Sequence, residues 1–187
     1  MTGLTGVALG LRLAGESMND PTLGLMYGDR SLSGELVASG DLPYGLRVSG
    51  MVGYRRTGGH QLDADGQLSS STSWIRYVPV SATVGLHRAF SRVDLGLGVG
   101  PATVGFSEQV GEGDPETSRG WKWGALLEGD ARVQLGQLQA TDTAFAVDVS
   151  LGYRAMLRRH GEVCGDEAVC GLDLSAVRIG LGAVVML

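Results

Sequence analysis

Residues 121–135 alternate between apolar and polar side chains with a period of two. Successive side chains of a β-strand point to opposite faces, so this period predicts a strand that separates two environments. One face of this stretch carries tryptophan, alanine, leucine and valine, whereas the other includes Glu128, Asp130 and Arg132. Several other segments repeat the alternation without helical periodicity between them. The pattern therefore favours an all-β fold with one greasy face and one charged face.

The alternation divides the chain into eight strand-like segments. Residues 23–27 could extend or replace the second of them, because they are also largely apolar. The segments cover residues 3–15, 30–40, 45–56, 73–88, 92–106, 119–135, 143–157 and 171–187. One barrel of eight strands would use the whole chain, so we expect a single domain over residues 1–187.

Composition excludes several classes of protein. The chain is 43 % hydrophobic, yet its longest apolar run, Ala183–Leu187, is far shorter than the roughly 20 residues of a membrane helix. A net charge of -5 and scattered basic residues argue against a nucleic-acid partner.

The first residues lack a basic segment and already alternate, so we expect Met1 to stand in place of a cleaved signal peptide.

The connections between the predicted strands alternate in length. Short joins at 41–44, 87–91 and 136–142 are interleaved with long polar ones near 16–29, 57–72, 107–118 and 158–170. Outer-membrane barrels have tight turns on the periplasmic side and longer loops outside. This asymmetry places both termini on the side of the short turns.

Aromatic residues are expected near both ends of such strands, because they collect at the two membrane interfaces. In the predicted topology, the belt near the long connections consists of Tyr54, Trp74, Phe106, Trp121 and Trp123, and the belt near the short turns of Tyr44, Phe90 and Phe145. The spacing thus predicts two aromatic girdles.

The polar face of the strands mixes the smallest side chains with the longest. Glycines such as Gly96, Gly98 and Gly100 share it with several arginines. A narrow eight-stranded lumen needs small residues opposite large ones, whereas a solvent-exposed strand face gains nothing from glycine. We therefore predict that the polar face points into the barrel, although a soluble carrier of lipocalin type, with its apolar face inside, is the alternative.

Charged residues of both signs are predicted to meet in this lumen. They are Arg12, Glu35, Arg47, Glu128, Asp130, Arg132, Asp148, Arg154 and Arg178. Buried charges persist when they are paired, so the first interpretation is a set of salt bridges that fills a closed barrel. The second is a small gated pore.

The whole chain resembles the small outer-membrane barrels of the OmpA, OmpX and OmpW type. The resemblance rests on eight alternating strands, on the alternating connections and on the final strand from Val177 to Leu187. It implies an eight-stranded antiparallel up-and-down transmembrane β-barrel in the bacterial outer membrane, monomeric, without cofactor, and surrounded by lipid and lipopolysaccharide. Members of these families usually end in an aromatic residue, and Leu187 departs from that pattern.

Two cysteines, Cys164 and Cys170, lie in the last long connection. A pair of cysteines outside the cytoplasm predicts a disulfide that closes a small loop. A metal site that combines both thiolates with His160, Asp166 or Glu167 is the alternative, but this spacing matches no known ligand pattern, and we expect no metal.

Acidic residues gather in two other long connections. They are Glu108, Glu112, Asp114 and Glu116 in the third, and Asp63 and Asp65 in the second. We interpret both groups as solvated loops, with divalent-ion bridges to anionic lipid headgroups as the alternative.

Some small outer-membrane barrels are lipid A deacylases or acyltransferases that use serine and histidine near the outer rim. Here His60 and His160 fall in outer loops, with residues 69–71 as nearby serines, and His87 falls at a periplasmic turn. Nothing marks these residues as a catalytic set, so we expect no enzyme. The expected role is structural or binding: a surface anchor, an adhesin-like protein, or a membrane subunit whose loops or periplasmic turns meet a protein partner.

Overall fold

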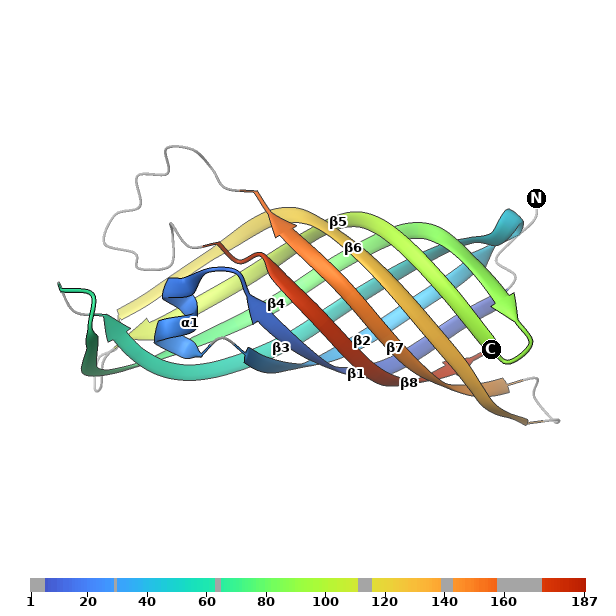
Figure 1. Cartoon of the computed structure of the whole chain (residues 1–187), viewed down its shortest axis with the longest axis horizontal. Coiled ribbons are helices and arrows are strands. Elements are labelled where there is room, and N and C mark those ends of the chain that lie inside the picture. The colour runs from blue at the N-terminus through green and yellow to red at the C-terminus, as the bar shows by residue number, and fades with distance from the viewer. Residues whose placement is uncertain (1–5, 29, 63–64, 111–115, 139–142, 158–172) are drawn as a thin grey trace.

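The computed structural model is a closed barrel of eight antiparallel strands in up-and-down order (Figure 1). It describes residues 6–28, 30–62, 65–110, 116–138, 143–157 and 173–187. Each strand pairs with the next along the chain, and the last strand pairs with the first. The fold predicted from the alternation is confirmed. Within the described ranges, no helix has the length and apolarity needed to span a membrane.

All eight predicted strands are present, several of them longer than expected. Their bounds are β1 (Gly6–Met18), β2 (Arg30–Leu42), β3 (Leu46–Leu62), β4 (Leu68–Phe90), β5 (Val93–Val110), β6 (Glu116–Leu138), β7 (Thr143–Met156) and β8 (Ala176–Met186). Most of the predicted connection 57–72 is in fact the β3–β4 hairpin, with Gly58 opposite Trp74 and His60 opposite Thr72. The alternation weakens there because serine and threonine replace large apolar residues. The backbone pairing nevertheless continues.

The predicted connection 16–29 contains a short helix, α1 (Pro21–Tyr27). The Asp20 carboxylate caps it by accepting hydrogen bonds from the backbone N–H groups of Thr22 and Leu23 at 2.8 and 3.3 Å. Pro21 fits the first turn because its missing N–H would have had no partner there. The alternative in which residues 23–27 extend or replace the second strand is therefore wrong. Figure 1 shows α1 at the end of the barrel opposite the C-terminus.

We call the two ends of the barrel the α1 end and the terminal end. β1 starts and β8 finishes at the terminal end, where the backbone N–H of Leu187 donates to the Val7 carbonyl at 2.8 Å. Two tight turns lie at the same end, one a 3₁₀ turn at Pro43–Gly45 and the other at Ser91, where φ is 54°. The start of β1 and the end of β8 are thus on the short-turn side, as predicted.

Large apolar side chains cover the outside of the barrel. Leu11 and Leu13 on β1, and Ile179 and Leu181 on β8, are each 61 to 66 % exposed. A protein surrounded by water rarely presents so extended an apolar surface, whereas lipid covers it without cost. The charged residues of the same strands point inward, so the lipocalin-type alternative is wrong.

Glycines on the inner face let neighbouring strands approach closely. A Cβ atom at Gly100 on β5 would lie 1.9 Å from the Ala82 carbonyl oxygen on β4, and one at Gly182 on β8 would lie 2.4 Å from the Leu11 carbonyl oxygen on β1. A larger residue could fit only if the backbones moved apart.

Replacement of Gly100 by alanine tests this close approach. We expect Gly100→Ala to lower the free energy of unfolding by about 1–3 kcal/mol, because the new methyl group overpacks two paired strands. The measurement is urea unfolding of the barrel in detergent, followed by tryptophan fluorescence. Gly34→Ala is the matched control, since Gly34 faces outward and a Cβ there meets nothing within 4 Å. Equal unfolding midpoints for the two variants would contradict the close approach.

Candidate functional site

The middle of the lumen holds a cluster of two arginines and three carboxylates, which we call the central cluster. Arg12 donates to Asp148 Oδ2 at 2.7 Å and to Glu128 Oε1 at 3.1 Å. Arg178 donates to both Glu35 and Glu128. These side chains come from five different strands, so the cluster joins opposite walls of the barrel. Four of the five are at most 4 % exposed, and none is left without an opposite charge.

A second cluster, the Arg47 cluster, lies nearer the terminal end. Arg47 donates to Asp41 Oδ1 at 2.6 Å, to Asp130 Oδ2 at 3.3 Å, and to Asp94. His87 lies beside them, with Nδ1 3.3 Å from Asp94 Oδ1. The sequence placed His87 in a turn, but β4 continues past it and turns its ring into the lumen.

Three members of this cluster lie within reach of a common metal ion. One ligand atom each from Asp41, His87 and Asp94 lies within 4.8 Å of the others. The Arg47 guanidinium, however, already contacts both carboxylates and supplies the positive charge that a metal would bring. The arrangement is therefore an ion-pair network. Arg132 extends it, since its Nε lies 3.8 Å from Asp130 Oδ2 while its guanidinium donates to Ser39 Oγ at 2.8 Å.

A third ion pair lies between the central cluster and α1. Arg154 donates two parallel hydrogen bonds of 3.0 and 3.2 Å to the Glu16 carboxylate, and Arg55 Nη1 lies 3.6 Å from the same carboxylate. Arg55 also stacks over the Tyr77 ring, 4.9 Å from its centroid. From the sequence, Glu16 was expected in a connection, whereas Arg55 was expected on the polar face of the strands but was not included among the charges predicted to pair. Glu16 shares the inward face of β1 with Arg12, and Arg55 shares the inward face of β3 with Arg47.

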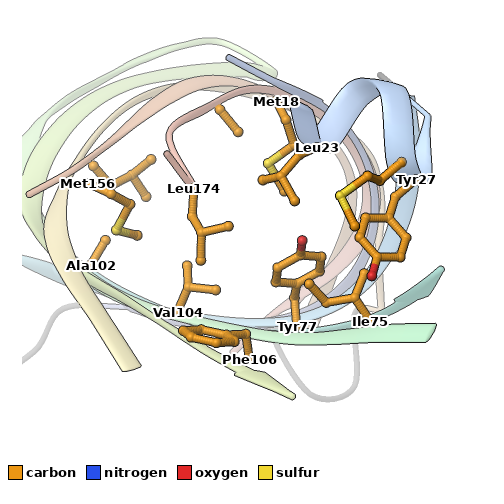
Figure 2. Close-up of a cluster of buried hydrophobic side chains, with 13 residues drawn as sticks. Met18, Leu23, Tyr27, Ile75, Tyr77, Ala102, Val104, Phe106, Met156 and Leu174 are labelled. Carbon is orange, nitrogen blue, oxygen red and sulfur yellow. The ribbon is translucent and has the colours of Figure 1, made fainter. Parts of the chain in front are cut away.

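The α1 end of the lumen is filled by an apolar core (Figure 2). Leu23 and Tyr27 from α1 enter it from one side, and Leu174 enters it from the segment before β8. Met26 of α1 belongs to the same core. The strands contribute Met18, Ile75, Tyr77, Ala102, Val104, Phe106, Leu126, Met156 and Ala176. The interior thus changes from apolar at the α1 end to charged in the middle and at the terminal end.

The prediction that Phe106 belongs to the aromatic girdle was wrong. Phe106 was expected at the membrane interface, but it is 8 % exposed and packs inside the apolar core. Even-numbered residues of β5 face the lumen, as Gly96 and Gly98 also do. The remaining seven girdle residues are 44 to 96 % exposed: Tyr54, Trp74, Trp121 and Trp123 toward the α1 end, and Tyr44, Phe90 and Phe145 toward the terminal end.

A buried carboxylate fastens α1 to the barrel wall. Glu108, expected in a solvated loop, lies on β5 and is 1 % exposed. It accepts a hydrogen bond from the Tyr27 hydroxyl at the end of α1. The pKa of Tyr27 is raised above its ordinary value, mainly by burial and secondly by the hydrogen bond to Glu108. The phenol therefore stays protonated and donates. Gly59 allows the helix to approach β3, since a Cβ there would lie 1.9 Å from the Met26 carbonyl oxygen.

Several candidates from the sequence remain predictions. Asp63, Glu112, Asp114, His160, Cys164, Asp166, Glu167 and Cys170 lie outside the described residues, so the structure tests neither the disulfide nor the alternative metal site. Of the proposed histidine and serine set, His60 lies exposed in the β3–β4 hairpin opposite Thr72. Residues 69–71 belong to the β4 side of the same hairpin.

Replacement of Arg178 tests the central cluster. Arg178→Met removes one of the two cations that Glu35 and Glu128 share and leaves Arg12 as the other. We expect it to lower the free energy of unfolding by about 3–5 kcal/mol. Arg178→Met/Glu35→Gln should recover part of that loss, because one of the stranded charges is gone. The matched control is Arg88→Met, an exposed outward position on β4. Urea midpoints that are the same for all three proteins would rule out the cluster as a source of stability.

Replacement of Tyr27 tests the link between α1 and the wall. Tyr27→Phe keeps the packed ring but leaves the buried Glu108 without its donor, which costs about 1–3 kcal/mol. We expect faster hydrogen exchange of the α1 amides, measured by mass spectrometry. Tyr153→Phe is the control, because the Tyr153 hydroxyl accepts its 3.0 Å bond from Asn19 at an exposed position. If α1 exchanges at the same rate in both variants, Glu108 does not hold the helix.

Comparisons with known proteins agree on the architecture. No family model matches the chain, and no curated protein matches it. Among solved structures, it is similar to OprG from Pseudomonas aeruginosa, with a TM-score of 0.63 and 9 % identity over 100 % of this chain and 97 % of that one. It is also similar to Ail from Yersinia pestis in complex with sucrose octasulfate, a heparin analogue, with a TM-score of 0.56 and 15 % identity over the whole of both chains. A major outer membrane protein from Thermus thermophilus gives a TM-score of 0.59 and 16 % identity over 96 % of this chain and 99 % of that one. The chain therefore has the fold of the small eight-stranded outer-membrane β-barrels.

Proposed function

We propose that this protein is a bacterial outer-membrane barrel with a closed lumen, and that it acts as a structural or binding module at the cell surface. The observation that carries the proposal is the filling of the lumen. From the α1 end to the terminal end, the interior passes from the apolar core to the ion pair of Glu16 with Arg154, then to the central cluster and the Arg47 cluster. Each layer is built from side chains of strands on different sides of the barrel.

The space left inside supports this proposal. Two interior voids between the central cluster and the Arg47 cluster measure about 10 and 20 Å³. A void of this size holds about one water molecule, whereas a conducting path needs a continuous water column. A barrel of eight strands is only wide enough for its own side chains. The proposal therefore does not include transport.

The outward apolar surface, with an aromatic belt toward each end, supports a membrane setting. The neighbours of the same fold are outer membrane proteins, and one of them, Ail, is an attachment invasion locus protein. We assign the α1 end to the cell exterior, since the long hairpins and α1 lie there while the tight turns lie at the terminal end. Recognition of a protein partner would then belong to the hairpins around α1.

The proposal is non-enzymatic. Among the described residues, no hydrogen bond joins His60 to a serine, and the nearest cross-strand residue is Thr72. The other described histidine, His87, sits in the Arg47 cluster, where carboxylates surround it. A nucleophile needs a base within hydrogen-bonding reach, and neither histidine serves one.

Planar-bilayer recording tests the closed lumen. We expect the purified barrel, inserted into a planar bilayer, to give no single-channel steps, because layers of ion pairs and an apolar core stand in series along its axis. An open porin recorded in the same bilayer is the positive control, and protection of the barrel from protease in vesicles confirms its insertion. Reproducible unit steps from an inserted barrel would overturn the proposal and favour the gated pore.

A further inference from the structure

Three arginines form one cross-strand row on the outside of four neighbouring strands. Arg56 on β3 lies opposite Arg76 on β4, Arg76 lies opposite Ser107 on β5, and Ser107 lies opposite Arg119 on β6. All three arginine side chains are exposed and share the outward face with lipid-facing residues. We call this set the arginine row.

The arginine row is electrostatically unfavourable on its own. Like charges directly opposite each other on a sheet destabilise it, because their Cβ atoms are only about 4.5–5.5 Å apart. Among the described residues, no carboxylate forms an ion pair with Arg56, Arg76 or Arg119. The inward arginines differ, since each lies within 3.8 Å of a carboxylate: Arg12, Arg47, Arg55, Arg132, Arg154 and Arg178. Within the described part of the chain, the row therefore carries positive charge that an external anion can balance.

A hollow of about 490 Å³ opens on the outer surface between Arg76 and Arg119. Val78, Gly105 and Trp121 form its apolar floor. Gly105 leaves room for the Trp121 ring, which lies against its backbone and would be 3.0 Å from a Cβ there. A bound molecule in this hollow would meet cationic side chains at one edge and apolar surface beneath.

Aromatic side chains place the row at the boundary between lipid tails and headgroups. The Arg56 guanidinium stacks over the Trp74 ring, 4.5 Å from its centroid, and Tyr54 and Trp121 belong to the same exposed belt. Such belts lie at the level of the headgroups, and anionic headgroups begin where the apolar surface ends. An arginine there can reach a phosphate while its aliphatic stem stays on apolar surface.

We propose that Arg76 and Arg119 bind the phosphate of an anionic glycolipid in the outer leaflet, and that one of its acyl chains lies in the hollow below them. The guanidinium fork donates two parallel hydrogen bonds to phosphate oxygens, a geometry that lysine does not provide. The two arginines are separated by a single strand, so their side chains can converge on one anion above Ser107. This inference rests on the proposed outer-membrane setting.

The apolar floor favours a lipid over a soluble anion. A free phosphate would occupy only the edge of the hollow and leave Val78 and Trp121 uncovered. The hollow also opens toward the bilayer rather than along the barrel axis, since every arginine that borders it faces outward. A molecule that carries both a phosphate and a hydrocarbon chain matches both the arginines and the apolar floor.

Lipid binding by the double variant Arg76→Gln/Arg119→Gln tests the proposal. Native mass spectrometry of the full-length barrel in detergent would count bound molecules of bisphosphorylated lipid A, with dephosphorylated lipid A and inorganic phosphate as separate arms. We expect the wild-type barrel to bind bisphosphorylated lipid A, and the double variant to bind it at least about ten-fold more weakly, since two charge-assisted contacts are lost. Dephosphorylated lipid A should bind both proteins equally weakly.

Arg88→Gln is the matched control. Arg88 is an exposed outward arginine on the same strand as Arg76, and it stacks over the Phe90 ring at 5.1 Å near the terminal end. Its replacement should leave lipid A binding unchanged. Equal binding by the double variant and the wild type, or displacement of lipid A by inorganic phosphate at comparable concentration, would overturn the proposal.

The unfolding midpoint gives a second readout of opposite sign. Without lipid A, the double variant should unfold at the same or a higher urea concentration than the wild type, because like charges have been removed. With lipid A, only the wild type and Arg88→Gln should gain resistance to urea. A gain in the double variant would also contradict the assignment. If the barrel inserts into vesicles but lipid A has no effect, this inference fails and the proposed setting stands; failure to insert would instead refute the setting.

Discussion

The closure of eight alternating strands between two media is the constraint on which the rest of the structure depends. Because side chains alternate strictly, a slip of one residue in any strand would turn its charges toward lipid and its leucines into the lumen. On β1 such a slip would expose Arg12 and Glu16 and bury Leu11 and Leu13. Ring closure adds a second condition, since β1 must match β2 and β8 at once. The register of one strand therefore depends on all the others.

The ion pairs of the lumen make slips of two residues unfavourable as well. A shift by two preserves inward and outward faces, so alternation alone cannot exclude it. Arg178, however, reaches Glu35 and Glu128 from β8, and Arg12 reaches Glu128 and Asp148 from β1. A shift of β8 by two residues would move Arg178 about 6–7 Å along the barrel, away from Glu35 and Glu128. The loss of this cation is costly because the carboxylates lie in a medium of low dielectric constant. In this barrel the buried charges thus specify the register.

Alternation predicted much of the fold and of the lumen, and its failures have a common physical cause. Glu108 and Glu16 were misplaced because the predicted strands stopped where the outward face ceased to be strongly apolar, whereas backbone pairing continued. Phe106 lay inside its predicted strand, but it was assigned to the girdle from its place near the strand end and not from its side of the strand. The face of each residue was still readable from the parity of its own strand. The helix α1 was missed although Asp20 and Pro21 form a recognisable start, because seven residues are too few for a helical period. Which charges meet across the lumen depends on the stagger of strands distant in sequence, which local pattern does not contain.

The use of arginine explains how one chain serves both media. Lys122 is the only lysine among 15 basic residues. Inside the barrel, the planar guanidinium bridges two carboxylates at once, as Arg178 does, and a flexible ammonium would satisfy them less completely. Outside, the same fork suits a phosphate, and its flat face stacks on an aromatic belt, as Arg56 does on Trp74. The two sets differ in the source of their anions. The lumen supplies its own carboxylates, so its charge balance is complete on folding. The arginine row has none among the described residues, and the partner proposed for it is a phosphate of the surrounding lipid. The inner arginines therefore stabilise the fold, whereas the outer ones are available to an anion from the surroundings.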